Sequence, residues 1–253
     1  MNAYAIWAIY RYEMNRLGRT IMQSVISPVV STSLYFIVFG AAIGARMETG
    51  TDVAYGGFIT PGLIMLALVT QSIQSGQTAI YFPKFTGTIY EILSAPIALS
   101  EILIGYVGAA ATKGMIVALI ILATSGFFVD IRVDHPLMML LFMVLTAVSF
   151  SLAGFILGIW AKNFEQLSLV PMLVVPPLTF LGGTFYSVTA LPPFWQVVSH
   201  FNPVFYLVSG FRWSFFSQAD VNPMISLAMV GVFLGLCLLV CGWMFRSGYK
   251  LKS

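Results

Sequence analysis

Residues 137–160 read LMMLLFMVLTAVSFSLAGFILGIW, a stretch of apolar and small side chains without one charged residue. A helix needs about 20 such residues to cross the hydrocarbon core of a bilayer, because each residue adds only about 1.5 Å of rise. Five other stretches are also apolar, and one of them contains a single charged residue, Lys113. The sequence therefore predicts six transmembrane helices, over residues 21–44, 57–81, 102–128, 137–160, 167–184 and 224–245.

The overall composition indicates an integral membrane protein. Of the 253 residues, 59% are hydrophobic and 8% are charged, and the mean hydropathy is +0.92. Soluble domains carry roughly 25% charged residues. We expect one all-α polytopic membrane domain over residues 1–253. No basic patch with interleaved aromatic residues indicates nucleic acid, and no histidine or cysteine spacing predicts a metal site.

The distribution of lysine and arginine predicts the orientation. Six spans place both termini on one side, and cytoplasmic loops carry the excess of basic residues. The side that holds the termini has eight basic residues, namely Arg11, Arg16, Arg19, Lys84, Lys162, Arg246, Lys250 and Lys252. The opposite side has three, Arg46, Arg132 and Arg212, together with the acidic residues Glu48, Asp52, Asp130, Asp134 and Asp220. Both termini are therefore predicted to be cytoplasmic.

Two helices are predicted on the cytoplasmic side outside the spans. Before the first span, apolar residues recur every three or four positions: Ala3, Ile6, Tyr10, Met14, Leu17 and Ile21. This spacing is typical of an amphipathic helix that lies on the inner leaflet. Between the second and third spans, residues 86–99 read TGTIYEILSAPIAL. Thr88 and Glu91 have the spacing of a capping box, and Pro96 ends the helix. One face of this short helix is apolar: Ile89, Ile92 and Leu93.

Residues 185–223 are too aromatic for a solvated loop, and prolines divide them into pieces too short to span. Pro192, Pro193 and Pro203 are expected to divide this segment into helical pieces of about 8 and 15 residues. A seventh span here would move the basic C-terminal tail to the outer side. We therefore expect a re-entrant or interfacial helical hairpin on the outer side, buried in protein or lining a cavity.

Polar residues inside the spans form two faces. The first span carries Ser24, Ser27, Ser31 and Tyr35, and the second carries Gln71, Gln74, Ser75 and Thr78. Hydrogen bonding between helices and the wall of a transport path are both compatible with this pattern. Lys113 lies near the middle of the third span, where a charge needs protein or water around it. The sequence assigns it no acidic partner, so pairing with helix carbonyls, snorkelling and a substrate role stay open.

Glycine and proline mark further features of the spans. Three G-x-x-x-G pairs, Gly40/Gly44, Gly154/Gly158 and Gly231/Gly235, predict close helix packing, within one subunit or between two. In the fifth span, prolines predict a kink that serves as a gate or as a static bend, at Pro171, Pro176 and Pro177. Asn163 and Gln166 have the spacing that caps the start of this span.

Four segments of the chain resemble the permease subunits of the ABC-2 family, the membrane half of ABC exporters. They are FITPGLIM at 58–65, G-T-x-x-E-x-L-x-A-P at 87–96, FSLAGFILGIWAKNFEQLSLVP at 150–171, and LGGTFYSVTALPPFWQVVSHFNPVFYLVSGFRW at 181–213. The resemblance runs from about residue 10 to residue 253. The chain has no G-x-x-x-x-G-K-[ST] motif, so it has no P-loop with which to hydrolyse ATP and is not expected to be an enzyme.

The resemblance implies a homodimer of permeases in the bacterial inner membrane with two separate ATPase subunits, which bind ATP and magnesium. It implies export of an amphipathic, lipid-linked or hydrophobic substrate. Contact with the ATPase is expected at Arg11, Arg16, Thr86, Gly87, Thr88, Ile89, Glu91, Ile92, Leu93 and Pro96. Together with the polar faces, the resemblance implies these candidates for the translocation path or gate: Ser27, Ser31, Tyr35, Gln71, Gln74, Thr78, Pro176, Pro177, Phe185, Tyr186, Trp195 and Phe205.

Two other classes of function are compatible with the sequence. A carrier or channel that works without an ATPase predicts a polar or charged relay through several spans, and only Lys113 fits one. A membrane scaffold without transport activity would leave the amphipathic faces unexplained. The substrate is not specified by any motif.

Overall fold

The computed structural model describes residues 2–43 and 55–250, which form helices and turns with no strand among them. Gly44, Arg46, Glu48, Asp52 and Lys252 lie outside these residues. Within the described ranges, six helical stretches are long and apolar enough to cross a membrane, as predicted: Met22–Phe39, Tyr55–Thr86, Leu99–Ser125, Pro136–Trp160, Phe164–Leu181 and Pro223–Ser247.

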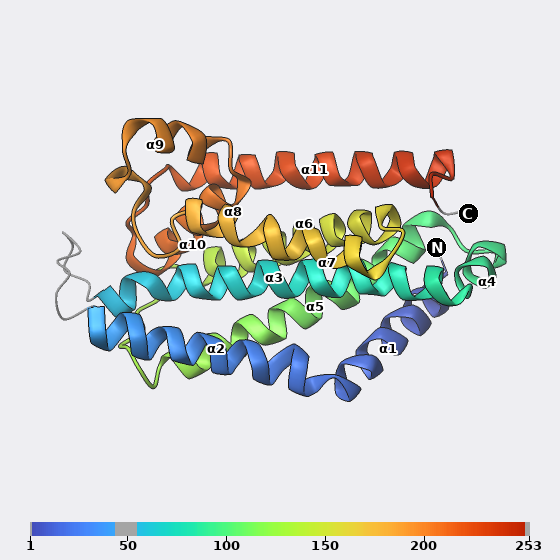
Figure 1. Ribbon diagram of the computed structural model, residues 1–253, viewed down its shortest axis with the longest axis horizontal. Coiled ribbons are helices and arrows are strands. Elements are labelled where there is room, and N and C mark those ends of the chain that lie inside the picture. Colours follow the sequence, from blue (N-terminus) through green and yellow to red (C-terminus); the bar gives the residue numbers. More distant parts are fainter. Residues whose placement is uncertain (1, 44–54, 251–253) are drawn as a thin grey trace.

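The helices run along the long axis of the molecule, and the two chain termini lie at the same end (Figure 1). That end also holds the N-terminal part of α1 (Ala3–Arg19) and the short α4 (Ile89–Ser94). The opposite end holds α9 (Pro193–His200) and α10 (Pro203–Phe216). We call these the terminal end and the outer end.

The first span is not a uniform α-helix. It consists of a π-helix at Met22–Ile26 (η1), α2 (Ser27–Tyr35) and a second π-helix at Phe36–Ile43 (η2). A π-turn inserts one residue into the hydrogen-bonding pattern, and such turns are frequent at functional sites. The first span therefore has a local backbone irregularity on both sides of its central helix.

At the centre of the bundle, α3 (Tyr55–Thr86) packs between α5 (Leu99–Ser125) and α6 (Pro136–Trp160). Glycine allows this close approach. A Cβ added to Gly154 of α6 would lie 2.3 Å from the carbonyl oxygen of Ile73, and one on Gly158 would lie 2.4 Å from that of Gln77. The Gly154/Gly158 pair therefore packs helices within one subunit.

The second described glycine pair has no such contact. Gly231 and Gly235 lie on α11 (Pro223–Ser247), and a Cβ on either would meet no atom within 4 Å. The same motif therefore packs α6 against α3, whereas in α11 it lies on an open surface. Gly44, and with it the Gly40/Gly44 pair, lies outside the described residues.

The fifth span is interrupted as its prolines predict. It is divided at Val174 into α7 (Phe164–Leu173) and α8 (Val175–Leu181). Its start is also capped as expected. The Asn163 side chain accepts a hydrogen bond from Gln166 N at 2.8 Å, and Gln166 Oε1 accepts one from Lys162 N at 3.0 Å.

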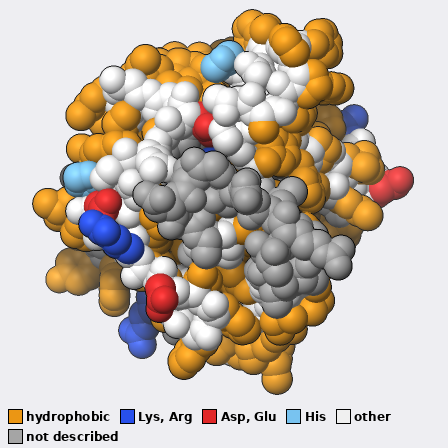
Figure 2. Space-filling view, turned by 90° about the vertical axis from the view of Figure 1, so that its left-hand side faces the viewer, with side chains coloured by type: hydrophobic (Ala, Val, Ile, Leu, Met, Phe, Trp, Pro, Cys, Tyr) orange, Lys and Arg blue, Asp and Glu red, His pale blue; other side chains and the backbone are white. Residues whose placement is uncertain are grey.

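Residues 185–223, which we call the outer segment, contain a 3-10 turn at Val188–Ala190 (η4), and then α9 and α10 with 8 and 14 residues, close to the predicted lengths. Most of α10 is buried against α3, α6 and α11. By contrast, α9 and the residue that follows it expose large apolar side chains: Phe194, Trp195, Val197 and Phe201. Viewed from the outer end, hydrophobic side chains make up much of the circumference, and the charged side chains of the described residues lie scattered among them (Figure 2).

Arg212 forms an ion pair within the outer segment and a hydrogen bond that joins this segment to the end of the fifth span. Arg212 of α10 lies 3.3 Å from Asp220, and its Nη2 donates to the carbonyl oxygen of Gly183 at 2.5 Å. Its guanidinium also lies 4.1 Å from the centre of the Phe58 ring. Burial lowers the pKa of Arg212 to about 10, and Asp220 opposes that shift, so the side chain stays charged at neutral pH.

Candidate functional site

The two polar faces predicted from the sequence meet in one groove between the first span and α3. We call it the polar groove, and its volume is about 580 Å³. Described residues that line it include Gln23, Ser27, Ser31, Thr32, Tyr35, Thr70, Gln71 and Gln74. Of the path candidates, Ser27, Ser31, Tyr35, Gln71 and Gln74 are therefore neighbours. Ser27, Ser31 and Gln74 are exposed, so the groove opens on the side of the bundle.

Toward the terminal end, the polar groove continues into a second pocket of about 330 Å³, which we call the basal pocket. Gln23, Gln71 and Gln74 line both cavities. Thr78, the sixth polar candidate for the path, lines the basal pocket. The side chains that complete its described lining are Arg16, Thr20, Ser24, Ser75, Phe82 and Lys113.

Lys113 has an acidic partner that sequence reasoning missed. Its Nζ lies 2.7 Å from Glu13 Oε2, and Arg16 Nη1 lies 3.2 Å from the other carboxylate oxygen, Oε1. The side chains of Glu13 and Lys113 are 1% and 7% exposed. A buried charge is tolerated when it is paired, and this pair joins α1 to the third span. Glu13 is the one acidic residue before residue 48, and that isolation was the available signal.

A second acidic residue connects α1 to the third span nearer the terminal end. Glu101 accepts hydrogen bonds from the backbone N–H groups of Asn2 and of Ala98, the latter at 2.9 Å. Gly105 permits close packing here, since a Cβ at that position would lie 2.9 Å from the Ile9 side chain. The N-terminal helix is therefore fixed along α5.

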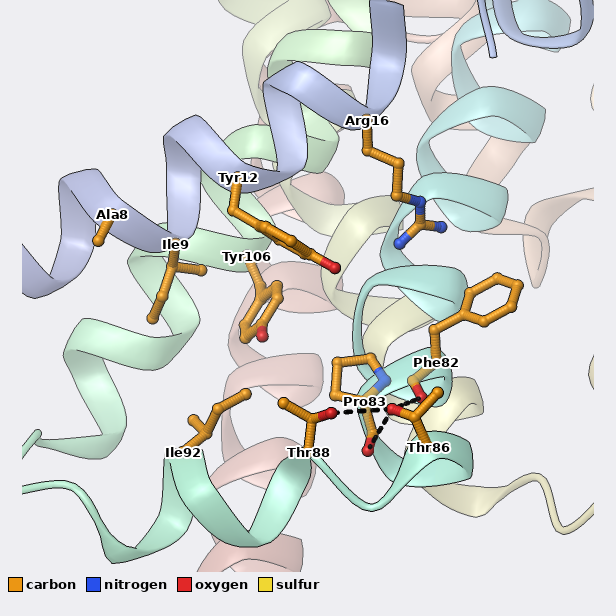
Figure 3. Close-up of a pocket in the computed structure, with 10 residues that line it drawn as sticks. All are labelled: Ala8, Ile9, Tyr12, Arg16, Phe82, Pro83, Thr86, Thr88, Ile92 and Tyr106. Carbon is orange, nitrogen blue, oxygen red and sulfur yellow. Dashed lines mark hydrogen bonds between the residues drawn. The ribbon is translucent and has the colours of Figure 1, made fainter. Parts of the chain in front are cut away.

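The predicted coupling elements surround a groove of about 500 Å³ at the terminal end (Figure 3). We call it the terminal groove. One wall comes from α1, and the other comes from the end of α3 and the start of α4. The lining consists of Ala8, Ile9, Tyr12, Arg16, Phe82, Pro83, Thr86, Thr88, Ile92 and Tyr106. Four of the coupling candidates thus line one cavity: Arg16, Thr86, Thr88 and Ile92.

The predicted capping box of α4 is wrong. Thr88 adopts helical dihedral angles, and its side chain makes no capping hydrogen bond. Instead, its hydroxyl lies 3.0 Å from that of Thr86. The backbone turns at Gly87, whose φ of +82° favours glycine. Glu91 is exposed on this short helix and is therefore accessible to a partner.

The other coupling candidates differ in exposure. Ile89 is buried and holds α4 against the bundle, whereas Leu93 is 38% exposed. Pro96 and Arg11 are also exposed, and Arg11 is not part of the described lining of the terminal groove. The predicted apolar face of α4 is thus divided between anchoring the helix and facing outward.

An aromatic cluster lies where the polar groove ends. The Phe185 ring lies 5.9 Å from that of Tyr35, 5.1 Å from that of Phe39 and 5.1 Å from that of Phe180. Tyr186 packs in the same apolar cluster. Residues from the first span and from the end of the fifth therefore meet beside the groove.

The remaining gate candidates lie elsewhere. Trp195 is 44% exposed on α9, and Phe205 is buried beside His200 and Tyr206 inside the outer segment. Pro176 and Pro177 occupy the first turn of α8 and are absent from the described lining of the polar groove. The structure brings none of these four to the groove.

The fold, with its six spans, lateral polar groove and terminal helices, is that of a membrane transport permease. The chain belongs to the ABC-2 type transporter family, whose model matches residues 4–216. This family of permeases works with an ATP-binding subunit, and its members are transporters rather than enzymes.

Individual relatives agree with this assignment. The chain is 41% identical to the inner membrane transport permease YadH of Escherichia coli (strain K12) over 249 residues, which are 98% of this chain and 97% of the relative. It is 22% identical to nodulation protein J of Rhizobium meliloti (strain 1021), over 81% of this chain and 79% of that protein. These similarities and the six apolar helices make the chain a multi-pass protein of the inner membrane.

Proposed function

We propose that this chain is the permease subunit of an ATP-driven exporter in which two copies assemble with two copies of a separate ATP-binding subunit. The observation that carries the proposal is the terminal groove, where α1 and α4 converge beside both termini. The positive-inside rule predicts that this end faces the cytoplasm. ATP and magnesium would bind to the partner, since the sequence contains no P-loop.

The surface beside α4 has the character of a protein-binding site. Phe85, Tyr90 and Leu93 are large apolar or aromatic residues with exposed fractions of 63%, 50% and 38%. They lie at or beyond the end of the second span, where we expect water rather than lipid tails. Exposed apolar residues next to a concave groove are typical of docking sites for another protein.

The open side of the polar groove supports a second permease copy. Ser27 and Ser31 of the first span and Gln74 of α3 are exposed on the flank of the bundle. In a bilayer, these groups would face lipid tails, which offer no hydrogen-bonding partner. A second copy across this face would enclose the groove, and a path between two subunits would result.

In this mechanism, closure of the ATPase dimer moves α4 together with α1. The helix α4 joins α3 to α5, and α1 is tied to α5 through Glu13 and Lys113. Movement at the terminal end is therefore transmitted to both walls of the polar groove. The aromatic cluster at Tyr35 and Phe185 would open last and release the substrate outward. The outward direction is inferred from the family resemblance.

The test uses the permease co-expressed with a candidate ATP-binding subunit. Leu93→Ala should reduce recovery of the ATPase in detergent pull-downs and its activity in nanodiscs by roughly fivefold, as expected for losing an apolar contact of about 1 kcal/mol. Leu137→Ala is the matched control, because Leu137 is 82% exposed at the outer end. Equal recovery and activity for both variants would contradict docking through α4.

A further inference from the structure

The basal pocket combines positive charge with neutral hydrogen-bonding groups. Of its described lining residues, Arg16 and Lys113 are cationic, and none is acidic. Glu13 lies behind this lining, where one carboxylate pairs with both cations. Two positive charges and one negative charge leave a net charge of +1 beside the pocket.

The neutral lining groups can also serve an anion. The amide groups of Gln23 and Gln74 carry N–H donors, and Gln71 Nε2 donates one N–H to Ser75 Oγ at 3.2 Å and has a second. The Thr20 hydroxyl donates to the Arg16 carbonyl oxygen at 3.2 Å and lies 3.1 Å from the Ser24 hydroxyl, which can rotate to donate. Amide and hydroxyl donors next to guanidinium and ammonium groups are the chemistry that binds phosphate or carboxylate oxygens. Four parts of the chain contribute to this lining, namely α1, η1, α3 and α5.

The geometry leaves room for an additional ligand on Arg16. Its guanidinium uses Nη1 for Glu13 at 3.2 Å and lies over the Phe82 ring at 4.9 Å from the ring centre. The side chain remains 27% exposed. A guanidinium has five N–H donors in a planar fork, so one carboxylate does not occupy them all.

The position of the pocket selects for an amphipathic anion. It is continuous with the polar groove through Gln23, Gln71 and Gln74, and it lies at the terminal end of the first span. A lipid of the inner leaflet would place its head group at this depth while its chains stay in the bilayer. A small inorganic anion would occupy the basal pocket alone and would make no use of the adjoining polar groove.

We propose that the basal pocket binds the phosphate group of an anionic amphipathic molecule, with Arg16 as its principal cationic ligand and Lys113 as a buried supporting charge. The proposal deepens the proposed function, because it assigns the chemical class that is admitted to the polar groove. The binding itself requires neither ATP nor the partner subunit. It can therefore be tested separately from transport.

The experiment measures dissociation constants by native mass spectrometry of the full-length permease in a neutral detergent. The probes are dioleoyl phosphatidylglycerol and, as the control with the same chains and no phosphate group, dioleoylglycerol. We expect the wild type to bind phosphatidylglycerol more tightly, and Arg16→Gln to weaken that binding by roughly tenfold, the loss expected for a charge-assisted hydrogen bond. Arg19→Gln, an exposed arginine on the same helix and outside the described lining, should leave it unchanged.

Gln74 provides a test of sign, since it lines the pocket and its side chain is exposed. Gln74→Lys should tighten phosphatidylglycerol binding and Gln74→Glu should weaken it, each by several-fold. Equal affinity for the two lipids, or equal effects of the Arg16 and Arg19 variants, would overturn the proposal.

Inorganic phosphate distinguishes the source of the anion. Displacement of phosphatidylglycerol by millimolar phosphate would assign recognition to the phosphate group alone, and absence of displacement would assign it to the lipid-borne head group. Both outcomes keep the anion site. If the ATPase pull-down fails while Arg16 still controls lipid binding, the proposed function fails and the anion site stands.

Discussion

Gly154 is a position where a single added methyl group should disturb the packing of two helices. Its ideal Cβ would lie 2.3 Å from the Ile73 carbonyl oxygen, which belongs to the backbone of α3 and cannot rotate away. Real Cβ atoms essentially never approach closer than 3.0 Å. In Gly154→Ala, α3 and α6 must therefore separate locally by roughly 0.7 Å.

Two opposing terms set the size of the effect. Overpacking a close interface costs about 1–3 kcal/mol, whereas alanine gains up to about 1 kcal/mol over glycine in helix propensity. We expect Gly154→Ala to lower the free energy of unfolding by about 1–2 kcal/mol. Gly231→Ala has only the second term, because its Cβ would meet no atom within 4 Å. It should be neutral or stabilising.

The assay is reversible unfolding in mixed micelles, with the midpoint followed by circular dichroism, for the wild type and both variants. The difference between the two alanine variants cancels most of the propensity term, since each replaces a glycine in the interior of a long helix. Equal stability of Gly154→Ala and Gly231→Ala would refute the close packing of Gly154 on Ile73. A loss of stability in Gly231→Ala alone would refute it as well.

Two other predictions follow from the charges and aromatic rings. Replacing both Glu13 and Lys113 by glutamine should cost less stability than either single replacement, since loss of one buried partner costs about 3–5 kcal/mol. Glu13→Gln should cost more than Lys113→Gln, because in Lys113→Gln the Glu13 carboxylate keeps Arg16 as a partner. The same unfolding assay measures this order, and additive single effects would contradict it. Phe185→Ala should raise leak of a small dye from proteoliposomes by loosening the cluster with Tyr35, whereas Trp195→Ala, located away from that cluster, should not; equal leak would remove Phe185 from the gate.

Much of the bundle could be predicted because its signals are local. Six apolar stretches specify six helices, since a polar backbone in lipid must satisfy its hydrogen bonds within each helix. Proline at positions 171, 176 and 177 predicts the break at Val174, and the prolines of residues 192–203 predict the lengths of α9 and α10. The polar faces were also visible at helical spacing, and they meet in the polar groove.

The capping box shows where local pattern was insufficient. Thr88 and Glu91 have the right spacing, but the box requires an extended backbone at Thr88. The left-handed turn at Gly87 places Thr88 in the helical region, so its hydroxyl meets Thr86 instead. The conformation of a preceding residue decided the outcome.

The sequence by itself determined that this is a membrane protein with six spans, because hydropathy, the length of apolar stretches and the distribution of basic residues are local properties of the chain. Only the tertiary structure decided which residues became partners. Residues 137–160 predicted a helix but did not show that Gly154 and Gly158 pack on α3 while Gly231 and Gly235 pack on nothing described. Likewise, Glu13 and Lys113 are 100 residues apart and become an ion pair only because α1 folds back along α5. Charge pairing and close packing depend on distances in space, which helical periodicity does not encode.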